Sequence, residues 1–289
     1  MHPLLSQLIS RPPVLTDGAW GTLLQSLGLP PGECPDAWNI AHPALVADAA
    51  RQYVDAGSDI ILTNTFRSNR IALAPYGLAR RAGELNRLGV EISRRAAGTR
   101  AKVFASIGPS GKMLMAGDVT QQELEGAFSE QADAIAAAGA DGIVIETMAD
   151  LEEATIALKA AKATGLPVVV SMVFDSGKER DRTMMGATPE QVAEELEGLG
   201  ADVIGANCGA GIEGYIPVCT RLRGATRLPV WIKPNAGLPT VVEGSITYTM
   251  TPDHFARLAP ALRDAGATFI GGCCGTTPDF VRALRRTLS

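Results

Sequence analysis

Two adjacent cysteines near the end of the chain are the residues most suggestive of chemistry. Cys273 and Cys274 stand in the segment 271–276 (GGCCGT), directly after the short apolar run 267–270. A buried structural cysteine packs as a small hydrophobe and needs no neighbour of its own kind, and vicinal cysteines form a disulfide only with strained geometry. The flanking glycines allow a tight turn that would bring both sulfurs to one point. Two converging thiolates predict a soft divalent metal, with zinc first, and at least one more ligand elsewhere in the chain.

The elements that must position such a site follow from the apolar pattern. Short apolar runs alternate with longer amphipathic stretches, which predicts repeated βα units around a parallel sheet. The predicted strands cover residues 14–16, 59–63, 102–107, 142–145, 167–173, 203–206, 229–233 and 268–272. Eight parallel strands close a barrel, and no linker or low-complexity segment divides the chain. We therefore predict an α/β fold, a single-domain (β/α)8 TIM barrel over residues 1–289.

Polar residues stand where several of these strands end, and barrel active sites form at the C-terminal ends of the strands. Asp17 follows the first strand, Asn64 the second, Glu146 the fourth, Cys208 the sixth and Asn235 the seventh. Cys208 supplies the missing third sulfur. Three thiolates with one open position are expected of catalytic rather than structural zinc. An all-sulfur site makes bound water a poor source of hydroxide, and it suits the ionisation of an incoming substrate thiol.

Composition narrows the classes of function. The 289 residues carry a net charge of −5, with 46% hydrophobic and 20% charged residues, as in an ordinary soluble globular protein. The acidic balance and the lack of a Lys/Arg-rich run argue against nucleic acid or an anionic membrane as partner. We expect no membrane-spanning helix and no signal peptide. Five cysteines, an odd number, favour a reducing compartment over a disulfide framework, so we expect a cytoplasmic protein.

On its motifs the chain resembles the zinc-dependent homocysteine S-methyltransferases, including the homocysteine-binding module of cobalamin-dependent methionine synthase. The combination of Asn-Cys with Gly-Gly-Cys-Cys-Gly is highly specific, whereas Asp-Gly or Glu-Thr alone would be weak. The matching segments span nearly the whole chain in the family order: 17–22 (DGAWGT), 63–66 (TNTF), 108–111 (GPSG), 146–147 (ET), 207–209 (NCG), 233–237 (KPNAG) and 271–276 (GGCCGT).

The resemblance implies roles for individual residues. It makes Cys208, Cys273 and Cys274 the ligands of a catalytic Zn²⁺. Glu146 would hold the ammonium group of homocysteine through a charge-assisted contact, and Asp17 would assist it.

Four further positions are implied with less specific roles. The backbone amides around Gly18 and Ala19 would bind the homocysteine carboxylate. Asn235 would cap the open zinc position or orient the substrate, and Asn64 is a candidate substrate contact. Asp17 and Asn64 also fit as ordinary turn residues.

The implied reaction is an SN2 methyl transfer that converts homocysteine to methionine. Zinc would keep the substrate sulfur ionised well below the free thiol pKa of roughly 8.5. We expect the donor to be a methylated corrinoid carried by a separate protein, or a sulfonium such as S-methylmethionine. Betaine is the alternative, although Arg67 and Thr147 stand where the betaine-type pattern places tyrosines for cation–π contacts.

Two readings from other classes stay open at this point. One is a barrel lyase or phosphate-binding enzyme, for which Lys233 would be the Schiff-base lysine and the three cysteines would have no role. The other is a non-catalytic subunit that binds homocysteine or zinc. A homodimer is also compatible, because the outer helices of a barrel commonly support one.

Overall fold

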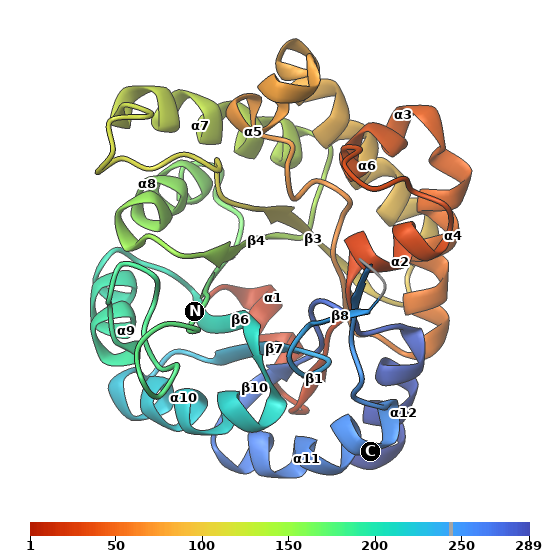
Figure 1. Ribbon diagram of the computed structural model, residues 1–289, viewed down its shortest axis with the longest axis vertical. Coiled ribbons are helices and arrows are strands. Elements are labelled where there is room, and N and C mark those ends of the chain that lie inside the picture. Colours follow the sequence, from red (N-terminus) through yellow and green to blue (C-terminus); the bar gives the residue numbers. More distant parts are fainter. Residues whose placement is uncertain (243–244) are drawn as a thin grey trace.

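The parallel strands close into a barrel, as predicted. The computed structural model describes residues 1–242 and 245–289. Its eight-stranded sheet has the order β1-β10-β7-β6-β5-β4-β3-β2, in which each pair of neighbours is parallel. A parallel bridge between Thr16 and Ile60 joins the two ends of this order and closes the ring, which helices surround (Figure 1). The (β/α)8 TIM barrel is thereby confirmed.

The strands fall where the apolar runs were, with changes in length. β3 has the predicted bounds, β1 and β2 are shorter than predicted, and β4 and β6 continue past the last apolar residue into the polar motifs. The barrel strands are β1 (Val14–Leu15), β2 (Ile60–Ile61), β3 (Lys102–Ile107), β4 (Gly142–Met148), β5 (Val168–Met172), β6 (Val203–Gly211), β7 (Val230–Asn235) and β10 (Ala267–Ile270).

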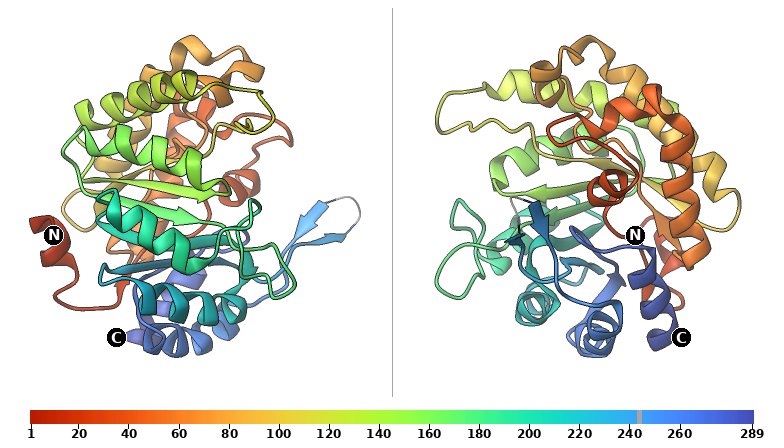
Figure 2. Two further views of the ribbon diagram at one scale, coloured as in Figure 1. Left: turned by 90° about the vertical axis from the view of Figure 1, so that its left-hand side faces the viewer. Right: turned by 45° about the vertical axis from the view of Figure 1, so that its right-hand side comes forward.

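A two-stranded hairpin was not predicted. β8 (Thr240–Val242) and β9 (Ser245–Thr247) pair in antiparallel fashion within the connection from β7 to α11. The hairpin projects away from the barrel (Figure 2). Its residues lack the apolar run that marks the barrel strands, so their pattern gave no strand signal.

Helices cover the outside of the barrel, and two of them begin at threonine capping boxes. Thr120 and Thr188 each form a capping box with the residue three positions on, and Pro189 occupies the first turn after Thr188. The helices are α1 (Pro3–Leu8), α2 (Trp20–Ser26), α3 (Trp38–Ala41), α4 (Pro43–Ala56), α5 (Arg70–Leu73), α6 (Ala82–Ala97), α7 (Gln121–Ala137), α8 (Leu151–Lys162), α9 (Pro189–Gly198), α10 (Ile212–Ala225), α11 (Pro252–Asp264) and α12 (Pro278–Leu288). Among the described residues no helix is both long and apolar enough to traverse a bilayer.

Aromatic rings fill part of the barrel interior. Trp231 lies between Phe104, at 6.5 Å between ring centroids, and Phe269, at 5.3 Å. All three side chains are fully buried, and Leu5 of α1 belongs to the same apolar cluster. A solid interior leaves the C-terminal ends of the strands as the place where a ligand can enter the barrel.

Close backbone packing between β6 and β7 gives a test of the fold. A Cβ atom at Gly205 would lie 2.1 Å from the carbonyl oxygen of Trp231, which is backbone and cannot rotate away. We expect Gly205→Ala to lower the free energy of unfolding by roughly 3 kcal/mol, measured by urea denaturation. Gly126→Ala in α7 is the control, because nothing lies within 4 Å of its added Cβ, and it should be neutral or stabilising by up to about 1 kcal/mol. Wild-type stability of Gly205→Ala would contradict the β6–β7 packing.

Candidate metal centre and active site

Three cysteine sulfurs meet at the C-terminal end of the barrel. Cys208 lies on β6, and Cys273 and Cys274 follow β10, with β7 between these two strands in the sheet. The three Sγ atoms all lie within 4.8 Å of one another, and those of Cys208 and Cys274 are 4.0 Å apart. The structure therefore brings together the three cysteines that the sequence singled out.

Unusual backbone conformations make this convergence possible. Cys208 has a φ of 65°, in the left-handed region that disfavours residues other than glycine. The pairing of β6 with β7 shifts register just after it, between Cys208 and Gly211. After β10, a Cβ atom at Gly271 would lie 1.9 Å from Thr16 Oγ1, so only glycine fits where the chain turns toward the cysteines. The glycines of the motif are therefore required by close packing.

The electrostatics of the three thiols fit a divalent cation. Hydrogen bonds from Cys273 and Cys274 lower the pKa of Cys208 to about 3. The hydrogen bond with Cys208 in turn raises the pKa of Cys273 to about 12, and the pKa of Cys274 is raised further by both neighbours. One sulfur thus ionises readily while the other two resist, since three negative charges at one point repel. A cation such as Zn²⁺ would offset that repulsion, and thiolate sulfur is one of its preferred ligands.

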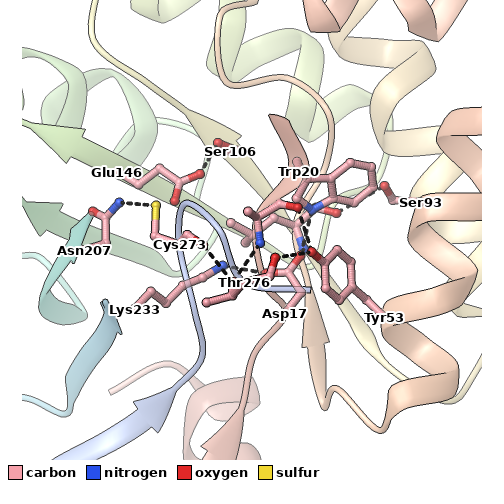
Figure 3. Close-up of polar contacts among 12 residues, drawn as sticks. Asp17, Trp20, Tyr53, Ser93, Ser106, Glu146, Asn207, Lys233, Cys273 and Thr276 are labelled. Atoms are coloured by element: carbon pink, nitrogen blue, oxygen red, sulfur yellow. Dashed lines mark hydrogen bonds and ion pairs between the residues drawn. The ribbon is translucent and has the colours of Figure 1, made fainter. Parts of the chain in front are cut away.

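Asn207 holds the metal centre to the neighbouring strand ends. Its Oδ1 accepts hydrogen bonds from the backbone N–H of Thr147 at 2.8 Å and from Ser171 Oγ at 2.7 Å. Its Nδ2 donates to Thr147 Oγ1 at 2.7 Å. It also donates to Cys273 Sγ at 3.8 Å (Figure 3). Thr147 has a φ of 61°, a strained conformation that these two bonds maintain. Sequence reasoning assigned Asn207 no role, although it stands directly before Cys208 in the recognised motif.

Glu146 lies at the end of β4 beside the sulfurs. Its side chain and that of Cys273 face the same space (Figure 3). Glu146 is 8% exposed, and Ser106 Oγ donates to its Oε1 at 2.5 Å. Burial raises the pKa of Glu146 to about 7, although the positive charge of Lys233 acts to lower it. A buried carboxylate with a second oxygen available suits the recognition of a substrate ammonium group.

Asp17 and Lys233 form a buried ion pair at the site. Lys233 Nζ lies 2.5 Å from Asp17 Oδ1, and the two side chains are 2% and 0% exposed. Asp17 Oδ2 accepts from Trp20 Nε1 at 2.8 Å and from the backbone N–H of Leu62 at 2.7 Å (Figure 3). Both oxygens of Asp17 are thus already engaged within the protein.

The environment of Lys233 disfavours the lyase reading. Burial acts to lower the pKa of Lys233, but the charges of Asp17 and Glu146 outweigh burial and raise it. A Schiff-base lysine needs the opposite, a lowered pKa and a neutral amine.

A cavity of about 360 Å³ opens onto these groups. Its wall includes seven of the nine predicted site residues, and Asp17 and Asn235 are not part of it. Those seven are Gly18, Ala19, Asn64, Glu146, Cys208, Cys273 and Cys274. Residues to which the sequence assigned no role also line it, namely Trp20, Asp36, Phe66 and Ser106. Lys233, the lysine of the lyase reading, lines it too.

The predicted carboxylate-binding turn is built around Thr276. Ala19 donates its backbone N–H to Thr276 Oγ1 at 3.2 Å, and Tyr53 donates its hydroxyl to the carbonyl of Ala19 at 2.6 Å. A Cβ atom at Gly18 would lie 2.8 Å from Thr276 Oγ1. No described residue accepts a hydrogen bond from the N–H of Gly18.

The two predicted asparagines occupy different environments. Asn64 Nδ2 donates to the carbonyl of Pro35 at 2.8 Å and to Asn39 Oδ1 at 3.0 Å. Asn64 therefore links the segment after β2 to the segment between α2 and α3 and to α3 itself. Asn235 Nδ2 donates to the carbonyl of Gly209 at 2.9 Å, next to Cys208. Asn235 Oδ1 is buried and has no hydrogen-bond partner among the described residues. A lone buried oxygen beside a thiolate ligand is compatible with a cation at this point.

Comparison with known proteins adds three findings. A model of the family described as homocysteine S-methyltransferase matches residues 14–288. The methionine synthases of Mycobacterium leprae (strain TN) and Mycobacterium tuberculosis (strain ATCC 25618 / H37Rv) are 30% and 31% identical over 299 residues. Those alignments cover 97% of this chain but only 24% and 25% of the two synthases. The chain therefore spans about a quarter of the length of these relatives.

The fold is shared with a solved structure. The crystal structure of the homocysteine methyltransferase MmuM from Escherichia coli in its metallated form superposes with a TM-score of 0.82, at 24% identity and with 99% of both chains covered. The oxidized form of the same protein gives a TM-score of 0.83 at 23% identity. These two matches support the barrel architecture independently of the strand pattern.

The raised pKa of Glu146 predicts a pH dependence of stability. Its folded value of about 7 exceeds the ordinary 4.5, so the folded chain binds this proton more tightly and stability falls as pH rises between those values. Between pH 5.5 and 7.5 we expect metal-free wild type to lose roughly 2 kcal/mol of unfolding free energy through this group. In urea denaturation at a series of pH values, the unfolding free energy of Glu146→Gln should lack this decrease, so its slope against pH should be smaller. Glu194→Gln, at an exposed position, should keep the whole slope, and equal slopes in all three proteins would contradict the assignment.

Proposed function

The chain belongs to the homocysteine S-methyltransferase family, and on this basis we propose that it transfers a methyl group to the sulfur of homocysteine, giving methionine. The observation that carries the proposal is the meeting of three cysteine sulfurs on the wall of a cavity that also contains Glu146. A thiol substrate with an ammonium group matches both features, since the sulfur has a metal centre to approach and the ammonium has a carboxylate.

Cys208, Cys273 and Cys274 would hold the metal. Zn²⁺ in this position would lower the pKa of the homocysteine thiol and keep it nucleophilic. Glu146 accepts a charge-assisted hydrogen bond from the substrate ammonium. The free N–H of Gly18 donates to the substrate carboxylate, and the bond between Ala19 and Thr276 fixes the turn that presents it.

The other predicted residues act around this core. Asp17 acts indirectly, because its hydrogen bond to Trp20 and its ion pair with Lys233 hold these two side chains of the cavity wall in place. Asn235 caps the open side of the metal centre or orients the substrate through its unpartnered Oδ1. Asn64 shapes the cavity wall through Pro35. With the sulfur and the ammonium both fixed, the thiolate points at the methyl donor in one direction, as in-line displacement requires.

The proposed donor is a methylated corrinoid on a separate protein or a sulfonium such as S-methylmethionine, with betaine as the alternative. Arg67 lines the cavity in the position where a tyrosine would favour betaine. We also propose a cytoplasmic location, because five cysteines, an odd number, favour a reducing compartment, and a homodimer stays a proposal.

Removing one metal ligand tests the centre. Cys208→Ala should lose both zinc, measured by inductively coupled plasma mass spectrometry, and methionine formation. Cys219→Ala is the matched control, because Cys219 is buried in α10 and contacts Leu262 rather than the cluster. It should keep stoichiometric zinc and turnover. Cys208→Ala with full zinc and full turnover would refute the ligand assignment.

A donor panel tests the reaction. Zinc-loaded protein and homocysteine should yield methionine with at least one of S-methylmethionine, betaine and methylcobalamin, quantified by mass spectrometry. A protein that binds zinc and homocysteine but forms no methionine with any donor, including a methylated corrinoid protein, would instead be a non-catalytic binding subunit.

A further inference from the structure

The segment that returns from the β8–β9 hairpin lies against the metal centre. The chain leaves β7 at Ala236, whose N–H donates to the carbonyl of Cys274 at 2.9 Å. It comes back at Met250, whose N–H donates to the carbonyl of Ala236 at 3.3 Å. The hairpin between these two residues projects away from the barrel (Figure 2). Its two ends are therefore joined to each other and to the backbone of a metal ligand.

The ring of Tyr248 packs on the turn that follows the two adjacent cysteines. A Cβ atom at Gly275 would lie 2.2 Å from Tyr248 Cγ and 2.5 Å from its Cδ2. Gly275 has a φ of 81°, so this turn needs glycine both for its backbone conformation and for the approach of the ring. Tyr248 is partly buried and also packs against the main apolar cluster of the barrel. The ring is thus fixed directly beside Cys274.

The hydroxyl of Tyr248 interacts with the sulfur of Cys274. Burial raises the pKa of Tyr248, and the negative charge of Cys274 and a hydrogen bond between the two side chains act in the same direction. The phenol therefore keeps its proton and is the donor in this bond. A hydrogen bond from a phenol to a thiolate is charge-assisted, so it stabilises the ionised form of the sulfur.

Each of the three sulfurs then has a polar side chain behind it. Cys273 Sγ accepts from Asn207 Nδ2 at 3.8 Å, and Cys208 has a hydrogen bond with the side chain of Asn235. Both asparagines belong to barrel strands, β6 and β7. Tyr248 comes instead from the connection between β9 and α11. Side chains that bond to metal ligands orient the ligand atoms and tune the metal.

We infer that Tyr248 is a positioning residue of the metal centre, which orients the Cys274 sulfur through its hydroxyl and fixes the turn at Gly275 through its ring. The inference rests on the proposed function, because it takes Cys274 as a metal ligand. Tyr248 does not belong to the wall of the cavity, whereas Cys274 does. Tyr248 therefore acts on the metal centre through Cys274 and does not contact a substrate in the cavity.

This contact couples metal binding to the segment that returns from the hairpin. With a cation bound, the Cys274 sulfur has one orientation, and Tyr248 is held with it. The N–H of Met250, two residues further on, bonds to Ala236 at the base of the hairpin. In wild type, hydrogen exchange at this N–H should therefore be slower with zinc than without it, and Tyr248→Phe should show a smaller difference. Equal exchange in wild type with and without zinc would contradict the coupling.

The main test compares the zinc affinity of Tyr248→Phe with that of wild type. Phenylalanine keeps the ring that packs on Gly275 and loses only the hydroxyl. Competition with a chromophoric chelator at neutral pH should show about tenfold weaker zinc binding by Tyr248→Phe, while the urea midpoint of the metal-free variant stays close to wild type. Tyr76→Phe is the matched control, because its hydroxyl contacts Arg67 Nη1 at 3.3 Å rather than a cysteine, and it should bind zinc as wild type does.

A cobalt spectrum distinguishes a bond to the sulfur from packing alone. With Co²⁺ in place of Zn²⁺, loss of the hydroxyl leaves the Cys274 sulfur richer in electrons, so the sulfur-to-cobalt charge-transfer band of Tyr248→Phe should move to longer wavelength. Wild-type zinc affinity or an unmoved band in Tyr248→Phe would overturn the inference. Neither measurement needs turnover. If Cys208→Ala loses zinc while Tyr248→Phe matches wild type, the role of Tyr248 fails alone, whereas full zinc in Cys208→Ala refutes the metal centre itself.

Discussion

The convergence of three thiols at one point is the constraint on which the rest of the site depends. Cys208 and the Cys273–Cys274 pair come from strands that flank β7, so both must bend toward each other across it. The left-handed backbone at Cys208 and the close packing at Gly271 are the means by which the chain achieves this. Neither would persist in isolation, because each is strained or sterically restricted. Asn207 holds one side of the arrangement through Thr147 and Ser171, and a cation removes the repulsion among the sulfurs.

Negative charge around the centre is distributed so that each carboxylate has a different partner. Asp17 is neutralised by Lys233 from within the protein, at 2.5 Å and with both groups buried. Glu146 stays beside the sulfurs, where burial raises its pKa to about 7 and makes it receptive to a cation. The negative charge of Asp17 also acts to raise the pKa of Glu146, whereas the positive charge of Lys233 acts to lower it. Lys233 is therefore a structural counter-ion of Asp17, and Glu146 remains as the carboxylate that we propose binds the substrate.

The sequence was sufficient for the barrel and for the metal ligands, because those depend on local patterns. Apolar runs and strand-end motifs are read within a few residues, and the bounds of β3 agreed with the structure. The partner of Asp17 could not be read in this way, since Lys233 lies 216 residues away. Asp36 carries no motif, and its burial depends on packing against the connection after β2. The β8–β9 hairpin could not be predicted either, because no apolar run of the barrel-strand type marks its strands.

The position of Glu146 beside the sulfurs also limits which molecule this carboxylate can bind. The homocysteine sulfur and ammonium are only a few bonds apart, so a sulfur fixed at the three cysteines requires a nearby carboxylate. Glu146 meets that requirement, because its side chain faces the same space as Cys273 (Figure 3).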